Sequence, residues 1–209
     1  MSADDTLSRV LAGRFADPDG PGTLSVATRQ VIIAPSLAQR APDLLHDCGI
    51  AGNRLAVVSD PDTLRVLGAR VEVALAGHAR IDRIVLPRSP HPDEETVDRV
   101  REAAAGSEAL VAVGSGTINN ITKMAAFRLG KPYAVFGTAP SMNGYTSPTA
   151  AITVHGHKKS LPAAAALGVF LDIGVLAAAP PRMIRAGLGD SLCRCTAQAD
   201  WLLAHVNPK

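Results

Sequence analysis

Residues Ala112 to Lys123, AVGSGTINNITK, place two glycines, a serine and a threonine directly after an apolar run. In open α/β sheets, ligands bind beyond the carboxyl ends of the strands, where the next helix offers its N-terminal N–H groups to phosphate. Gly114 and Gly116 would let the backbone approach a pyrophosphate, and Ser115 and Thr117 would add hydroxyl donors. A tight turn is the alternative explanation for a GxG pattern after a strand.

This stretch differs from two well-known nucleotide-binding motifs. Asn119 stands in place of the third glycine of the Rossmann pattern, and the Gly-Lys-Ser/Thr ending of a P-loop is missing. The acidic residue expected after the glycine loop instead precedes it, as Asp60 at the end of RLAVVSD. This order favours a dinucleotide site with Asp60 on the adenosine ribose hydroxyls and residues 114–118 on the pyrophosphate. Asp60 also precedes Pro61 as a helix N-cap, and the two roles are compatible.

Other residues that could bind a metal are placed unfavourably. His155 and His157 lie in TVHGHKKS, which is typical of a surface hairpin that points both rings to water. His205 follows Asp190 by 15 residues, which is about 22 Å along a continuous helix, so the two cannot share an ion. The three cysteines show no CxxC spacing, and we expect them to be free thiols.

Short apolar runs alternate with helical patterns along most of the chain. The runs include QVIIAPS, RLAVVSD, EVALAGH, RIVLP, ALVAVG and PYAVFGT. ALVAVG is almost continuously apolar, which indicates a strand covered on both faces. The alternation predicts an α/β fold, with a Rossmann-like, mainly parallel sheet that has helices on both faces.

The pattern changes twice along the chain. Residues 1–29 are polar and rich in Gly and Pro, and we expect an irregular lead-in or a loose edge hairpin. Residues 30–175 carry the α/β alternation and form the expected dinucleotide-binding domain. Residues 176–209 contain two helical patterns, which we interpret as the start of a truncated helical domain. Trp201, Leu202 and Leu203 in this last part are expected to lie in a core.

Composition excludes several function classes. Lys and Arg number 21 against 19 Asp and Glu, and only 3% of the residues are aromatic, which argues against a nucleic-acid partner. The longest apolar block, Ala163 to Leu171, is far shorter than the roughly 20 residues of a membrane span. The first residues lack the apolar core of a signal peptide, so we expect a cytoplasmic protein. An uncovered helical segment would favour homo-oligomers.

Four motifs occur in a distinctive order: GSGTINNITK, FGTAPSMNGYTSPTAAI, GHKKS and APPRMIRAGLGDSLCRCTAQADWLLAH. Together they resemble bacterial-type glycerol-1-phosphate dehydrogenases, within the dehydroquinate synthase-like, iron-containing alcohol dehydrogenase superfamily. The resemblance runs from about Gln30 over essentially the rest of the chain. It implies reversible reduction of dihydroxyacetone phosphate to glycerol 1-phosphate with NAD or NADP. It also implies a divalent metal (Zn, Ni or Fe) in the complete enzyme.

The resemblance assigns roles to individual residues. Asp190 corresponds to the family's first metal-binding aspartate and is the implied catalytic, substrate-binding and metal-binding residue. Asn143 stands where the family has a substrate-contacting acid, and Asn120 where it has an aspartate, so two negative charges near cofactor and substrate are absent. The implied cofactor-binding residues are Asp60, Gly114, Ser115, Gly116, Thr117, Ile118, Thr138, Ala139, Pro140, Ser141 and Ser147.

The choice between NAD and NADP stays open at this point, although Asp60 favours NAD because a carboxylate repels a 2′-phosphate. The family's two histidine metal ligands would lie beyond Lys209. We therefore expect a fragment or truncated dehydrogenase without activity on its own. The alternatives are a non-catalytic dinucleotide-binding remnant, another polyol dehydrogenase of the superfamily, or a dehydroquinate synthase-like enzyme.

Overall fold

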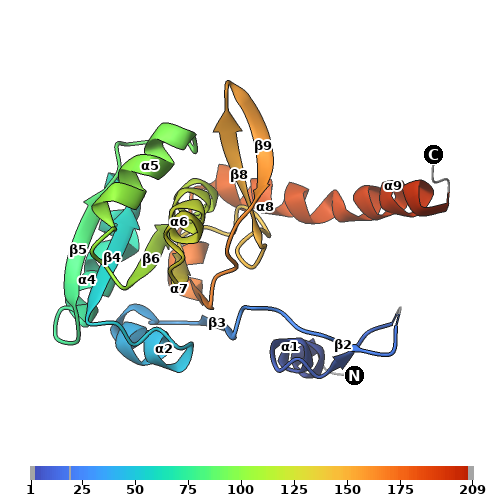
Figure 1. Cartoon of the computed structure of the whole chain (residues 1–209), viewed down its shortest axis with the longest axis horizontal. Helices are drawn as coiled ribbons and strands as arrows, with labels where there is room; N and C mark the ends of the chain where they lie inside the picture. The colour runs from blue at the N-terminus through green and yellow to red at the C-terminus, as the bar shows by residue number, and fades with distance from the viewer. Residues whose placement is uncertain (1–2, 19, 207–209) are drawn as a thin grey trace.

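A computed structural model describes residues 3–18 and 20–206. Its centre is a six-stranded sheet with the strand order β3-β10-β7-β6-β4-β5 (Figure 1). Every neighbouring pair of strands in this sheet is parallel, which confirms the predicted α/β class. The strands are β3 (Gln30–Ala34), β4 (Arg54–Ser59), β5 (Arg80–Val85), β6 (Ala109–Gly114), β7 (Tyr133–Gly137) and β10 (Gly168–Asp172).

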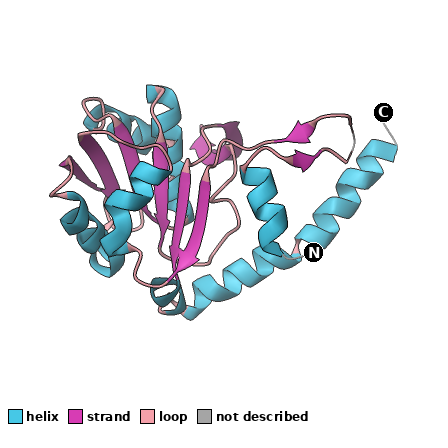
Figure 2. Cartoon of the chain, turned by 90° about the horizontal axis from the view of Figure 1, so that it is seen from below, coloured by secondary structure: helices cyan, strands magenta, loops and turns pink. Residues whose placement is uncertain are grey.

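Helices cover both faces of the sheet, as predicted (Figure 2). One face packs against η1 (Ala38–Arg40), α2 (Ala41–Asp47), η2 (Leu64–Gly68), α4 (Ala69–Leu75) and α7 (Ile173–Ala177). The other packs against α5 (Glu94–Ala103), α6 (Gly116–Leu129) and the hairpin of β8 (Thr149–Val154) with β9 (His157–Pro162). The short helix α3 (Pro61–Thr63) links β4 to η2. Two separate apolar cores result, one on each side of the sheet.

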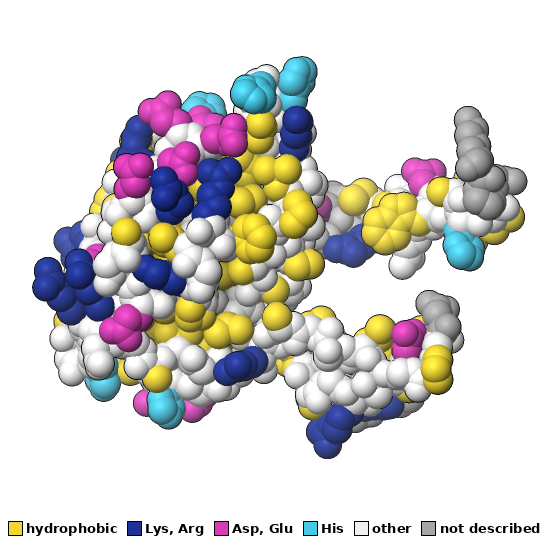
Figure 3. All heavy atoms as spheres, in the orientation of Figure 1, with side chains coloured by type: hydrophobic (Ala, Val, Ile, Leu, Met, Phe, Trp, Pro, Cys, Tyr) yellow, Lys and Arg dark blue, Asp and Glu magenta, His cyan; other side chains and the backbone are white. Residues whose placement is uncertain are grey.

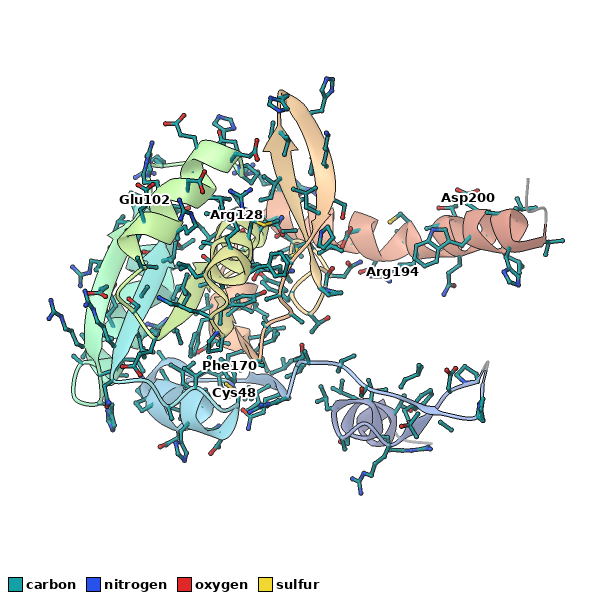
Figure 4. All side chains as sticks on the ribbon, viewed as in Figure 1. Cys48, Glu102, Arg128, Phe170, Arg194 and Asp200 are labelled. Atoms are coloured by element: carbon teal, nitrogen blue, oxygen red, sulfur yellow. The ribbon has the colours of Figure 1, made fainter. Side chains whose placement is uncertain are left out.

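The central strand β6 is buried along its whole length, because side chains on both of its faces meet one of the two cores. On the α2 side, the rings of Phe136 and Phe170 lie 4.9 Å apart. Phe170 and Cys48 lie close to one another there (Figure 4). Burial raises the pKa of the Cys48 thiol to about 11, so it remains protonated at neutral pH. Cys48 and Cys193 are free thiols, as predicted, whereas the side chain of Cys195 is outside the described part.

The start of the chain is more regular than its composition suggested. It forms helix α1 (Ala3–Leu11), followed by a two-stranded pairing of β1 (Phe15–Ala16) with β2 (Thr23–Leu24). The Arg9 guanidinium lies 5.5 Å from the centre of the Phe15 ring, so α1 contacts the hairpin that follows it. This segment thus contains a helix and a hairpin where the sequence suggested an irregular lead-in or a loose edge hairpin, and its assignment as a lead-in stays a prediction. Leu7, Val10 and Leu11 have helical spacing, but the polar residues between and before them made this pattern too weak to predict a helix.

The end of the chain forms the two predicted helices, α8 (Pro181–Leu192) and α9 (Arg194–Val206). Helix α9 extends away from the sheet, with apolar side chains visible along it (Figures 1 and 3). Trp201 is 79% exposed and Leu202 and Leu203 are similarly open, so the prediction that they form a core is wrong. These side chains are apolar, as expected of core residues, but no described element packs on that part of α9.

The division into segments 1–29, 30–175 and 176–209 stays a prediction. No helix in the described part of the chain is long and apolar enough to span a bilayer.

Candidate functional site

A cleft of about 1250 Å³ runs along the carboxyl edge of the sheet. Its walls come from the segments that follow each of the six parallel strands, which is where open α/β sheets bind ligands. The chain moves outward from β4 to β5 and then returns to place β6 on the other side of β4. The strand order therefore reverses at β4 and β6, and the crevice that ligands use opens between the loops after these two strands.

The register of the strands brings the predicted cofactor residues together. Val58 of β4 pairs with Ala112 of β6, so the segment that begins at Asp60 starts beside the end of β6. Gly114 pairs with Gly137 of β7, and the Thr138 N–H donates to the Gly114 carbonyl at 3.1 Å. Six of the eleven predicted cofactor residues consequently line the cleft: Asp60, Ser115, Thr117, Ile118, Thr138 and Ala139.

Asp60 is the N-cap that the sequence predicted. Its Oδ1 accepts hydrogen bonds from the N–H groups of Asp62 and Thr63 at 3.0 and 2.8 Å. The Thr63 hydroxyl in turn accepts a hydrogen bond from the Asp60 N–H, which completes a capping box. Both capping bonds of the carboxylate end on Oδ1. Within the described structure, Oδ2 is therefore the Asp60 oxygen that remains for a ligand hydroxyl.

The glycine loop forms the predicted strand–turn–helix arrangement. Ser115 is the N-cap of α6 in an extended conformation, and its side chain makes no capping hydrogen bond. No acidic residue lies in the first turn of α6, so the positive end of the helix dipole is not neutralised locally. This helix end, with Ser115 and Thr117 facing the cleft, suits an anionic group.

Gly114 has a role that sequence reasoning did not assign. A Cβ at this position would lie 2.5 Å from the Cβ of Ile118, so the glycine allows the first turn of α6 to pack on the end of β6. The nearest atom to a Cβ at Gly116 would be the Met142 Cγ at 3.6 Å, an ordinary contact. Backbone approach to a ligand therefore stays a prediction for Gly116, whereas Gly114 has a packing reason of its own.

Charged side chains other than Asp60 also line the cleft. Arg65, Arg70 and Arg182 belong to the cleft walls. Asp62 is paired with Arg88, whose Nη1 lies 3.0 and 2.9 Å from the two carboxylate oxygens. The pair is half-exposed, so water screens it and it contributes little to stability. Its effect at the site is to reduce the positive charge that a ligand meets beside Asp60.

Helix α8 packs directly on the loop that follows β7. A Cβ at Gly187 would lie 1.8 Å from the Pro140 carbonyl oxygen, so only glycine permits this approach. Three residues further along α8, the Asp190 Oδ2 accepts a hydrogen bond from the Asn143 N–H at 2.7 Å. The fold thus places the implied metal-binding aspartate beside the implied substrate residue, 47 positions away in sequence.

Five of the predicted cofactor residues lie outside the cleft walls: Gly114, Gly116, Pro140, Ser141 and Ser147. Pro140 and Ser141 form the backbone that receives α8. The Ser147 Oγ lies 2.8 Å from the Thr149 Oγ1 and accepts from the Thr149 N–H at 3.1 Å. Asn143 and Asp190 do not line the cleft either. Their hydrogen bond joins the loop after β7 to α8 outside the cleft walls.

Metal-ligating side chains do not gather around Asp190. Within the described residues, no group of three or more His, Cys, Asp or Glu is arranged to hold an ion. His155 and His157 are exposed at the turn of the β8–β9 hairpin, as predicted, and His205 is exposed on α9. One half-buried carboxylate does not by itself fit a divalent metal, because affinity requires several converging ligands.

Lys123 is a site residue whose role sequence reasoning missed. It lies on α6 with 0% exposure, and its Nζ donates to the carbonyls of Gly144, Ser147 and Thr149 at 3.1, 2.7 and 3.0 Å. Burial lowers the pKa of Lys123 to about 8. The three carbonyl oxygens around Nζ are acceptors, and an ammonium ion supplies one N–H for each of them. No distinctive signal in the sequence pointed to this role, because polar and apolar residues are mixed along GTINNITKMAAFRL.

Comparisons with known proteins identify relatives of this arrangement. A family model described as iron-containing alcohol dehydrogenase matches residues 32–180. The chain is 34% identical over 178 residues to a glycerol-1-phosphate dehydrogenase [NAD(P)+] of Methanothrix thermoacetophila, covering 84% of this chain and 49% of the relative. It is 31% identical over 209 residues to the protein of that name from Bacillus subtilis, covering 95% of this chain and 52% of the relative. The chain therefore spans about half the length of these relatives.

Solved structures support the fold. A probable glycerol dehydrogenase from Sinorhizobium meliloti superposes with a TM-score of 0.67 at 24% identity, covering 79% of this chain and 44% of that one. An iron-containing alcohol dehydrogenase from Thermococcus thioreducens superposes with a TM-score of 0.69 at 17% identity, covering 79% and 50%. The TM-scores show that the architecture is shared. At identities this low, the likeness concerns the fold alone.

Gly187→Ala should disrupt the contact between α8 and the loop. The added methyl group overlaps the Pro140 carbonyl, so the helix must shift and the Asn143–Asp190 hydrogen bond should be lost. We expect a loss of roughly 1–3 kcal/mol in unfolding free energy, typical of overpacking. The Asn143 amide should also exchange faster with deuterium. Both quantities are measurable by denaturation and by hydrogen exchange with mass spectrometry.

Gly189→Ala is the matched control on the same helix, because a Cβ there meets nothing within 4 Å. It should stabilise α8 by roughly 0.5–1 kcal/mol and leave the Asn143 amide unchanged. Equal behaviour of the two variants would contradict the proposed contact.

Proposed function

The chain belongs to the iron-containing alcohol dehydrogenase family, and on that premise we propose that it is the dinucleotide-binding half of an oxidoreductase of the glycerol-1-phosphate dehydrogenase type. The proposed cofactor is NAD or NADP. The proposed substrate pair is dihydroxyacetone phosphate and glycerol 1-phosphate, in line with the names of the relatives. A cytoplasmic location and homo-oligomers formed through the exposed apolar side chains of α8 and α9 belong to the same proposal.

The observation that carries the proposal is the meeting of three segments at the strand-order reversal. Asp60 follows β4, Ser115 and Thr117 begin α6 after β6, and Thr138 follows β7, all on the walls of one cleft. A dinucleotide needs an acceptor for ribose hydroxyls at one end and N–H donors for a pyrophosphate beside it. Asp60 supports the first of these roles and the α6 N-terminus supports the second.

NAD is the favoured cofactor within this proposal. The Asp60 carboxylate would repel a 2′-phosphate but accept hydrogen bonds from ribose hydroxyls through Oδ2. Arg65 and Arg70 on the same wall would attract a phosphate. The Arg65 guanidinium, however, lies 3.6 Å from the Asp62 carboxylate, and Arg70 donates to the Val66 carbonyl at 2.8 Å. The Arg65 charge is shared with Asp62, whereas Arg70 keeps its charge because a carbonyl partner does not neutralise it. The preference for NAD therefore rests on the Asp60 carboxylate.

A non-catalytic dinucleotide-binding module is the second candidate. The observation that favours it is the absence of a metal-binding group of three or more side chains among the described residues. The two candidates make the same predictions for cofactor binding and for the activity of the 209-residue chain alone. They differ in whether two suitably spaced histidines follow Lys209 in the reading frame, which the downstream DNA sequence would decide.

We predict that the chain binds NADH saturably at concentrations below about 1 mM. Gly116→Val should abolish the binding, because bulk at the start of α6 would block approach of a pyrophosphate to the backbone. Fluorescence titration or calorimetry measures the affinity, and thermal unfolding shows that the variant is folded. Gly77→Val is the control, since a Cβ there meets nothing within 4 Å and the residue lies outside the cleft. Absence of saturable binding by the folded wild-type chain would refute the proposed function.

We predict that Asp60→Asn weakens NADH binding by about 1–3 kcal/mol, because ribose hydroxyls would lose a charged acceptor. NADPH binding should weaken less or improve, since the repulsion of its 2′-phosphate is removed. Stability should change little, because Asn is also a good N-cap. Asp93→Asn is the matched control, since Asp93 caps α5 through the Thr96 N–H at 2.9 Å and is not a cleft residue. Unchanged affinity for both cofactors in the Asp60 variant would leave Asp60 with its capping role alone.

We predict that the 209-residue chain alone does not oxidise NADH with dihydroxyacetone phosphate, even with zinc, nickel or iron added. The reason is the single carboxylate at Asp190, which lacks converging ligands among the described residues. The assay follows NADH absorbance, with the metal-stripped chain as control. Metal-dependent turnover at ordinary enzyme rates of about 1–1000 per second would disprove the prediction. In that case, exposed histidines such as His155, or a second copy of the chain, would be supplying ligands.

A further inference from the structure

The segment between β7 and β8 carries much of the candidate site. Residues 138–148 include Thr138 and Ala139 in the cleft wall, Pro140 against α8, Asn143 beside Asp190, and Ser147. The Tyr145 hydroxyl donates to the Ala139 carbonyl at 2.8 Å and closes the first part of this segment on itself. The second part, from residue 144 onward, is where the buried lysine acts.

Lys123 holds this second part by three bonds from one atom. Its Nζ donates to the carbonyls of Gly144, Ser147 and Thr149, all within 3.1 Å. In the described structure no carboxylate pairs with the ammonium, and its hydrogen-bond partners there are these three carbonyls. A buried charge with neutral partners is costly to maintain. An apolar side chain on the buried face of α6 would avoid this cost. The presence of a lysine therefore indicates that its ammonium group has a function at this position.

The three carbonyls also need the ammonium as a hydrogen-bond donor. Three backbone oxygens converge on one point, and an unpaired buried carbonyl costs free energy comparable to a lost hydrogen bond. If the ammonium were removed, the Gly144 carbonyl would keep, in the described structure, only the long bond from the Ser147 N–H at 3.4 Å, and the Thr149 carbonyl the one from the Ser147 Oγ at 3.5 Å. The Ser147 carbonyl would lose its donor, and we expect the segment to turn these oxygens toward water. That rearrangement would move Asn143, one residue before Gly144, and Ser147 itself. The amide of Asn143 is the group that contacts Asp190.

We propose that Lys123 is a positioning residue that sets the conformation of residues 142–149, and thereby the place of Asn143 and Ser147 relative to the cleft. The first part of the proposal, that Lys123 orders the segment, follows from the hydrogen bonds alone. The second part, that this order affects cofactor binding, rests on the proposed function. A direct chemical role for the amine does not fit, because Lys123 is fully buried beneath the three carbonyls and is not a cleft residue.

Lys123→Met tests the proposal, since Met has a similar length and no charge. Lys131→Met is the matched control, because the Lys131 Nζ also donates to two carbonyls, those of Ala104 and Ala105 at 3.2 and 2.7 Å, away from the segment. Hydrogen exchange of the unliganded proteins should be at least about tenfold faster over residues 142–149 in Lys123→Met only. NADH affinity should fall by about the same factor in that variant and stay constant in the control.

Each outcome has a defined meaning. Unchanged exchange over residues 142–149 in folded Lys123→Met overturns the proposal, even if NADH still binds. Faster exchange with no NADH binding by the wild type refutes the proposed function but supports the role of Lys123. If Lys123→Met does not fold, hydrogen exchange of the wild-type protein tests the proposal instead. The amides of residues 143–149 should then exchange more slowly than those of the exposed hairpin turn at His155 and Gly156, and equal rates overturn the proposal.

Discussion

The parallel pairing of β6 with β4 on one side and β7 on the other determines where every part of the candidate site lies. Because these strands point the same way, the segments that follow them emerge at one edge of the sheet. The helix after β6 must return across the sheet, which brings its N-terminus to the same edge. The reversal of strand order then separates neighbouring loops and leaves a crevice between them. The cleft is thus a consequence of topology before any side chain is considered.

Contacts from two helices support the segment after β7 at this edge. The Lys123 ammonium of α6 binds its later carbonyls, and α8 meets its earlier backbone at Gly187. Surface segments of this length are commonly mobile because their polar groups bond to water. Here the protein itself supplies partners, including the Asp190 carboxylate for the Asn143 amide. In the proposed function, the residues that face cofactor and substrate are therefore held by contacts from α6 and α8.

Much of this arrangement could be predicted because its causes are local. Apolar runs such as ALVAVG indicate buried strands, and Asp60 before Pro61 indicates a helix N-cap, whatever the rest of the chain does. The exposed hairpin turn at His155 and His157 is predictable for the same reason. Helix α1 was missed because few apolar residues mark it, and β10 because its short apolar run continued from an alanine-rich stretch.

The sequence by itself determined the α/β class, the position of the glycine loop and the capping role of Asp60, since neighbouring residues decide each of these. Only the tertiary structure decided that Lys123 is buried under three carbonyls, that Gly187 meets Pro140, and that Trp201 is exposed. These facts depend on residues brought together from distant parts of the chain, or on the lack of a packed neighbour in the described part. Local patterns predict that a helix forms, whereas packing decides what each of its faces contacts.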